Sequence, residues 1–222
     1  MTDTLCFQEG STISIGQFIA EATLFAAQLP ARGYAINLAK DRYLALLGFA
    51  AALIRGHATL LHSDPAPVRL AALAARYPGA YALADFPLPA TALQIFTLYR
   101  PRAAAPHHPA PVIPAGQLAA IAFTSGSTGR PKAAMISYGN ITAMALGAQH
   151  YYHCDAQDAM LSYLPLCHVA EQIFTISLPM QSGAVVNFAE SIRTVQSDLR
   201  EIAPTIFWVC RAFGKKCTRP WC

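Results

Sequence analysis

Apolar residues recur with the period of a helix over residues 15–29. They stand three or four positions apart, and Pro30 follows the last of them. Residues at this spacing lie on one face of a helix, and proline cannot continue the helix because it lacks the backbone N–H donor. The pattern predicts an amphipathic helix that buries one face in a core.

Short apolar runs then alternate with longer helical patterns. In the first 100 residues we expect strands at 34–38, 59–61 and 81–83 and helices at 41–55 and 68–76. Later in the chain we expect strands at 118–123, 159–164, 184–188 and 205–209 and helices at 138–150, 169–180 and 191–201. Strands that alternate with helices favour a parallel sheet, because each helix crosses over one face. The predicted fold class is α/β, a mainly parallel sheet with helices on both faces.

A proline-rich segment, residues 101–114, separates these two halves. Five of its residues are proline, which favours extended backbone over helix or ladder. We therefore expect α/β subregions over 1–100 and 115–209, joined by this connection. The segment contains His107 and His108, which we interpret as a solvated pair because no further metal ligand is evident.

The segment richest in chemistry is Phe123-Thr124-Ser125-Gly126-Ser127-Thr128-Gly129-Arg130-Pro131-Lys132, directly after the apolar run 118–123. Its two glycines allow the backbone to approach a ligand closely. Its hydroxyl groups and backbone N–H groups can donate to phosphate oxygens, and Lys132 adds a positive charge. The segment predicts a phosphate-binding loop, and a plain Ser/Gly turn is the structural alternative.

Two other functional loops do not fit this segment. A Walker A loop requires Gly-Lys-Ser/Thr, but Arg130 and Pro131 separate Gly129 from Lys132. The Gly-x-Ser-x-Gly elbow of serine hydrolases is also absent. The loop therefore disfavours a P-loop kinase or GTPase and a serine hydrolase.

The ten-residue string resembles the phosphate-binding signature of the adenylate-forming superfamily, which includes acyl-CoA synthetases, luciferases and adenylation domains of peptide synthetases. Met135-Ile-Ser-Tyr-Gly-Asn-Ile141 resembles the start of the helix that follows it there. Leu161-Ser-Tyr-Leu-Pro-Leu-Cys-His-Val-Ala-Glu171 resembles the segment that precedes the acyl pocket of long-chain acyl-CoA synthetases. With Ala203-Pro-Thr-Ile-Phe-Trp-Val209, the resemblance covers residues 115–209. The N-terminal part is similar more loosely, and its short form resembles synthetases of polyketide and aryl-polyene type clusters.

This resemblance implies the ATP-binding N-terminal part of an AMP-forming fatty acid–CoA ligase. The substrates would be ATP and a fatty or other carboxylic acid, with Mg²⁺ as cofactor and CoA as co-substrate. Thr124 would be a ligand of Mg²⁺, Lys132 would contact phosphate, and His168 would lie at the mouth of the carboxylate pocket. A histidine at a helix start, satisfied by a backbone group, is the structural alternative for His168. The resemblance also implies that one run of residues wraps the β- and γ-phosphates: Thr124, Ser125, Gly126, Ser127, Thr128 and Gly129.

The later motifs of that family do not occur in the chain. The resemblance would require a Tyr-Gly-x-Thr-Glu type motif, a ribose-binding aspartate, a hinge and the lysine of a mobile C-terminal domain. Residues 210–222 instead hold three of the six cysteines and four basic residues without an acid. We expect a reading-frame change near Val209, a truncated enzyme without full turnover, and association through the exposed edge of the strand 205–209.

The distribution of charge and the cysteine pattern exclude further classes of protein. The net charge of +4 resides in the tail, because the rest of the chain carries 12 basic and 12 acidic residues. Nucleic-acid binding is disfavoured, since a basic stripe with interleaved aromatic residues is missing. The pairs His153-Cys154 and Cys167-His168 match no zinc-finger spacing. We expect a reduced, cytoplasmic protein, because there is no Cys-x-x-Cys pair and no basic signal segment.

No transmembrane segment is expected either. The longest uncharged apolar run is Tyr43–Ile54, whereas a membrane-spanning helix needs about 20 residues.

Two other functions stay open. The chain could be a non-catalytic nucleotide-binding or interaction module that keeps the loop without the chemistry. It could also be an adenylation domain for an aryl or amino acid that works with a carrier protein. The string Leu164-Pro-Leu-Cys-His-Val-Ala-Glu171 favours a fatty acid over these alternatives.

Overall fold

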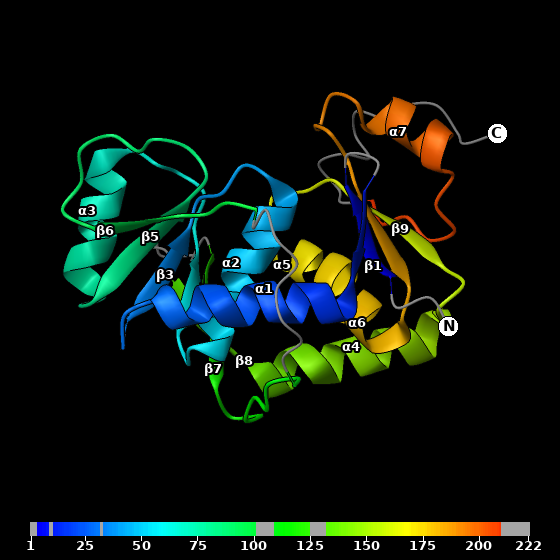
Figure 1. The fold of residues 1–222 in the computed structure, drawn as a ribbon, viewed down its shortest axis with the longest axis horizontal. Coiled ribbons are helices and arrows are strands. Elements are labelled where there is room, and N and C mark those ends of the chain that lie inside the picture. Colours follow the sequence, from blue (N-terminus) through cyan, green and yellow to red (C-terminus); the bar gives the residue numbers. More distant parts are fainter. Residues whose placement is uncertain (1–3, 9–10, 32, 101–108, 125–131, 210–222) are drawn as a thin grey trace.

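A computed structural model describes residues 4–8, 11–31, 33–100, 109–124 and 132–209. Within these ranges ten strands form two sheets, one of six strands and one of four. Figure 1 shows the sheets side by side, with the long N-terminal helix running across both. The expected sheet is thus divided in two.

The six-stranded sheet has the order β6-β5-β3-β4-β7-β8. Its first five strands in this order are parallel, and β8 is antiparallel to β7 at the edge. The strands are β3 (Tyr34–Asn37), β4 (Ala58–Leu61), β5 (Ala80–Ala84), β6 (Gln94–Thr97), β7 (Leu118–Thr124) and β8 (Lys132–Ser137).

The four-stranded sheet has the order β2-β1-β10-β9. Strands β1 (Thr4–Gln8), β10 (Val185–Phe188) and β9 (Ala159–Ser162) are parallel, and β2 (Ser11–Ser14) is antiparallel to β1. The sequence did not lead us to predict β1 and β2. Their signal was two short runs rich in β-formers separated by Glu9-Gly10, a spacing typical of a hairpin.

Helices connect the strands. They are α1 (Ile15–Gln28), α2 (Arg42–Ile54), α3 (Pro67–Arg76), α4 (Tyr138–Tyr152), α5 (Val169–Glu171), a π-helical segment η1 (Gln172–Ser177), α6 (Leu178–Ser182) and α7 (Val195–Ile202). Ser14, Asp41 and Ser137 cap the first, second and fourth of these by accepting from a backbone N–H of the first turn. Each of these helices therefore starts where the sequence offers a short polar side chain.

Helices cover both faces of the six-stranded sheet. Ala35 of β3 packs in one core cluster with residues of α1 and α2, whereas the next residue, Ile36, packs in another with Leu70 of α3. The period of two along a strand explains this alternation. In the four-stranded sheet, Met160 likewise faces Leu178 of α6, and Leu161 faces Leu199 of α7. The predicted α/β class, mostly parallel with helices on both faces, is confirmed.

Several predicted elements were wrong in type or extent. The helix expected over 169–180 consists of α5, η1 and α6, and that expected over 191–201 begins at Val195. Strands β6 and β8 were not predicted. The strand expected over 205–209 is a single bridge between Met160 and Ile206. At this bridge the Thr205 hydroxyl accepts a hydrogen bond from the Ala159 N–H at 2.9 Å. The side chain therefore binds a backbone N–H group that would pair with a backbone carbonyl if the strand were longer.

Both sheets combine strands from either side of the proline-rich connection. Strand β4 pairs with β7, and β1 pairs with β10. The division into subregions at 1–100, 101–114, 115–209 and 210–222 stays a proposal. Within the described ranges, none of the helices combines the length and apolar character required to cross a membrane.

Candidate functional site

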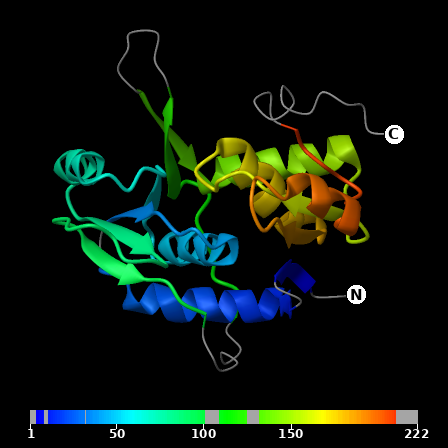
Figure 2. The ribbon, with the colours of Figure 1, turned by 90° about the horizontal axis from the view of Figure 1, so that it is seen from above.

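The predicted phosphate-binding loop joins the paired ends of β7 and β8. Thr124, the last residue of β7, is the register partner of Lys132, the first residue of β8. Figure 2 shows this hairpin extending away from the layer formed by α1 and α2. Ser125, Gly126, Ser127, Thr128 and Gly129 lie outside the described residues. The described ends place the start and finish of the loop opposite each other.

The loop follows the carboxyl end of a parallel strand. Strand β7 runs parallel to β4, with Leu61 opposite Ala122. Ligands of α/β proteins usually bind at this edge of the sheet. The position is therefore one where a phosphate cradle is common.

The side chain of Lys132 is exposed. The residue belongs to strand β8 and not to an irregular loop, and its backbone is tied to β7 by the antiparallel ladder. This pairing anchors the lysine at one end of the cradle. Its phosphate contact and the Mg²⁺ contact of Thr124 stay proposals.

His168 lies on the other sheet, in the segment that follows β9. Its side chain is exposed, and its backbone N–H donates to the Pro165 carbonyl at 2.8 Å. Its Nδ1 accepts from the Ala170 N–H at 3.3 Å. In the neutral ring the proton then resides on Nε2, which is the atom able to donate to an anionic ligand. The backbone contact expected of a helix-start histidine is present, yet it leaves the second ring nitrogen available for chemistry.

A buried ion pair contacts the chain on both sides of His168. Arg42 at the start of α2 has Nη1 at 3.8 Å from Oε1 of Glu171 in α5, and their side chains are 15% and 4% exposed. Arg42 also donates to the Leu164 carbonyl at 2.5 Å and to the Tyr163 carbonyl. Glu171 accepts from the Ser162 hydroxyl and from the Leu164 N–H at 3.3 Å. The guanidinium of Arg42 and the carboxylate of Glu171 thus hold the chain where it leaves β9.

Burial dominates the electrostatics of this pair. It raises the pKa of Glu171, against the hydrogen bond from Ser162 and the charge of Arg42, which lower it. Burial likewise lowers the pKa of Arg42, against the charge of Glu171. Both directions reflect the cost of removing a charge from water.

Sequence reasoning missed the role of this pair. Arg42 directly precedes the apolar run Tyr43–Ile54, and Glu171 ends the string that begins at Leu161, but the sequence analysis assigned neither residue a role. The available signal was a charged residue at the first turn of an otherwise apolar helix. Its partner could not be read from the sequence, because the two residues belong to elements far apart in the chain.

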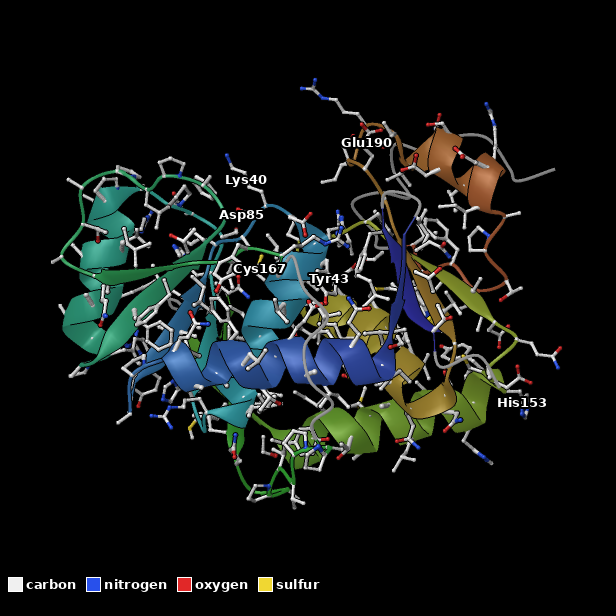
Figure 3. The ribbon with its side chains drawn as sticks, viewed as in Figure 1. Lys40, Tyr43, Asp85, His153, Cys167 and Glu190 are labelled. Carbon is white, nitrogen blue, oxygen red and sulfur yellow. The ribbon has the colours of Figure 1, made fainter. Side chains whose placement is uncertain are left out.

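A cavity of about 320 Å³ lies between the carboxyl ends of β3 and β4 and the segment that precedes His168. Its lining includes Lys40, Arg42 and Cys167, and Figure 3 shows Lys40 beside Asp85 at this edge. Asp85 accepts from the backbone N–H groups of Lys40 and Asp41. The Thr59 hydroxyl and His62 Nε2 also line the cavity, and both are buried without a hydrogen-bond partner among the described residues. The guanidinium of Arg42 is engaged by Glu171 and two carbonyls, but the Lys40 ammonium and these two polar groups on an apolar wall suit a ligand with an anionic end.

Within the part of the chain that the structure describes, no three His, Cys, Asp or Glu side chains gather as a metal site. His153 is the left-handed C-cap of α4 and is exposed, whereas Cys154 is buried and donates to the Ser182 hydroxyl at 3.3 Å. Adjacent in sequence, the two therefore have different environments.

Comparison with known proteins identifies the family of the chain. The family model described as AMP-binding enzyme matches residues 44–219. The human long-chain-fatty-acid–CoA ligase ACSBG2 is 41% identical over 98 residues, which are 42% of this chain and 15% of that protein. The chain thus matches a small part of the length of this curated relative.

Solved structures agree in fold. ATP-bound MatB from Rhodopseudomonas palustris superposes with a TM-score of 0.82 at 19% identity, over 99% of this chain and 48% of that one. O-succinylbenzoate CoA synthetase (MenE) from Bacillus subtilis, with ATP and magnesium, gives 0.80 at 16% identity, over 100% of this chain and 63% of that one. At these identities the likeness concerns the fold, which is that of the N-terminal domain of adenylate-forming enzymes. Because the family model covers more than half of the chain, this protein belongs to the AMP-binding enzyme family.

Proposed function

We propose that these 222 residues form the ATP-binding part of an AMP-forming carboxylic acid–CoA ligase that acts on a fatty acid. One observation carries the proposal: the hydroxyl-rich and glycine-rich string begins at Thr124 and ends at Lys132, on paired strands at the carboxyl edge of a parallel sheet. The fatty acid is supported by the human relative, which is named a long-chain-fatty-acid–CoA ligase.

The cradle, residues 124–129, would surround the β- and γ-phosphates of ATP. Lys132 would neutralise part of the polyphosphate charge from the start of β8. Mg²⁺ prefers oxygen ligands, so the hydroxyl of Thr124 is a suitable donor in this string. When bound, the ion would lower the negative charge that the attacking carboxylate meets. The protein's contribution would then be positioning and charge stabilisation.

His168 would hold the substrate carboxylate from the second sheet. With Nδ1 engaged by Ala170, the Nε2 proton can be donated to a carboxylate oxygen. That carboxylate would attack the α-phosphorus and displace pyrophosphate, and the CoA thiol would later displace AMP from the acyl adenylate. The family's later motifs do not occur among these 222 residues. We therefore propose that this part of the enzyme binds nucleotide but does not by itself complete the transfer of the acyl group to CoA.

The test is ATP–pyrophosphate exchange with a panel of fatty, aryl and amino acids, beside a nucleotide-binding titration. Exchange that depends on a fatty acid supports the ligase. Exchange with an aryl or amino acid supports an adenylation domain instead. Nucleotide binding without exchange supports a non-catalytic module, and absence of both contradicts the proposed site.

A further inference from the structure

We propose that Arg42 is a positioning residue, which with Glu171 holds the His168 segment of the four-stranded sheet in a set place against the six-stranded sheet. The inference rests on the proposed function only in the role of His168 as a residue that binds the substrate carboxylate. The positioning itself is a property of the chain and can be measured without a ligand.

Arg42 spans the boundary between the two sheets. It stands at the first position of α2, which follows β3 of the six-stranded sheet, and its guanidinium donates to the carbonyls of Tyr163 and Leu164 at the exit of β9. Two successive carbonyls bound by one planar group constrain both the place and the direction of the chain. An apolar side chain could make neither contact, and a lysine would have to make both from a single nitrogen, without the planar fork that fixes the direction of each bond.

Glu171 fastens the far end of the same segment. Its carboxylate accepts from the Ser162 hydroxyl and the Leu164 N–H, while its own N–H donates to the His168 carbonyl at 3.0 Å. The next residue, Gln172, donates its side-chain amide to the Leu166 carbonyl. Residues 162–171 therefore form a segment, from the end of β9 to the end of α5, whose two ends meet at one buried carboxylate, with His168 exposed near its second end.

The chemistry of the pair favours positioning over simple attachment. Buried charges are expensive, and apolar residues of similar volume often join two layers at less cost. Directional hydrogen bonds to backbone carbonyls, however, specify one arrangement where apolar packing tolerates several. The exposed His168 ring is bound through Nδ1 to the backbone N–H of Ala170, so its position follows from that of the backbone around it.

The first test needs no ligand. Hydrogen–deuterium exchange is measured on the amides of residues 164–172 in the wild type, in Arg42→Met and in Arg42→Lys. The matched control is Tyr43→Phe, which removes a buried hydrogen bond to Glu21 from the same helix but none of the contacts that Arg42 makes with Tyr163, Leu164 and Glu171. Positioning predicts at least about tenfold faster exchange in this segment for both Arg42 variants, beyond any change in Tyr43→Phe. Exchange that rises equally across the whole chain, or in the control, overturns the proposal.

The second test reads the consequence for the site. Affinities for ATP and for lauroyl sulfamoyladenosine, a stable acyl-adenylate mimic, are measured for Arg42→Lys, His168→Ala and the double variant. Positioning predicts that each single change weakens the mimic, that ATP affinity stays within about twofold, and that the double variant is no worse than His168→Ala. Additive losses, or equal losses for both ligands, contradict it. If wild type fails to bind the mimic, the proposed function fails, and the exchange experiment still decides the positioning.

Discussion

Thr124 and Lys132 stand opposite each other at the open end of the β7–β8 ladder, so the two ends of the phosphate-binding string share one strand register. The lysine is therefore placed by main-chain pairing and does not depend on the string for its position. The position of the Lys132 charge is therefore independent of the conformation of the loop. A substitution at Lys132 should remove charge without altering the fold.

We predict that Lys132→Met weakens ATP binding about tenfold, because a charge-assisted contact to phosphate is lost. The melting temperature should change little, since the side chain is exposed. The control is Arg200→Met, which removes an exposed positive charge from α7. Calorimetric titration of ATP measures both variants. Equal losses in the two would indicate a general charge effect and would count against the phosphate contact.

Two helix glycines should respond oppositely to alanine. A Cβ at Gly48 in α2 would lie 3.1 Å from Asn37 Nδ2 and 3.1 Å from a Leu83 methyl group. The Asn37 amide cannot move freely, because it donates to the Ala45 carbonyl at 2.7 Å. We expect Gly48→Ala to lower the free energy of unfolding by about 1–3 kcal/mol.

The matched control is Gly147→Ala in α4, where a Cβ meets nothing within 4 Å. We expect this variant to gain about 0.5–1 kcal/mol from helix propensity. Urea titrations of the two variants measure the difference. Stabilisation in both would show that α2 can shift away from the sheet, contrary to the close packing described.

The ionisation of Glu171 should make stability depend on pH. Burial raises its folded pKa above the ordinary value of 4.5, so the folded state holds the proton more tightly than the unfolded state. The free energy of unfolding should then fall as the pH rises from about 4.5 to the folded pKa, by about 1.4 kcal/mol for each pKa unit of difference.

Comparison of wild type with Glu171→Gln isolates this contribution, because all other acids titrate in both. The stability difference should move in favour of glutamine as the pH rises through that window. Movement toward glutamate would show that attraction to Arg42 outweighs the cost of burial. Urea unfolding at a series of pH values supplies the measurement.

Native-state alkylation should distinguish the described cysteines. Burial raises the pKa of the Cys6 thiol to about 12, and it also raises that of Cys154, which is buried as well. Cys167 is partly exposed and lines the cavity that also contains Lys40 and Arg42 in its wall. Because the thiolate is the reactive form, Cys167 should react with iodoacetamide first.

Peptide mapping by mass spectrometry follows each site separately, and urea-unfolded protein serves as the control in which the differences should vanish. Faster reaction at Cys6 than at Cys167 in native protein would contradict the packing of β1 against α1.

The sequence by itself determined the elements that depend on neighbours in the chain. The helical spacing over 15–29, the polar residues that cap α1, α2 and α4, and the string that ends at Lys132 are all local patterns. The alternation of strands and helices also sufficed for the α/β class. Such features are readable because hydrophobic period, capping and turn chemistry act over a few residues.

Only the tertiary structure decided which distant segments meet. Strand β1 joins β10 from the far part of the chain, residues 205–209 contribute one bridge where a strand was expected, and Arg42 finds Glu171 across two sheets. Each outcome depends on how the layers pack. A strand pairs with whichever neighbouring segment has unpaired backbone N–H and C=O groups. A buried charge requires an opposite charge, which can come from a residue far away in the sequence.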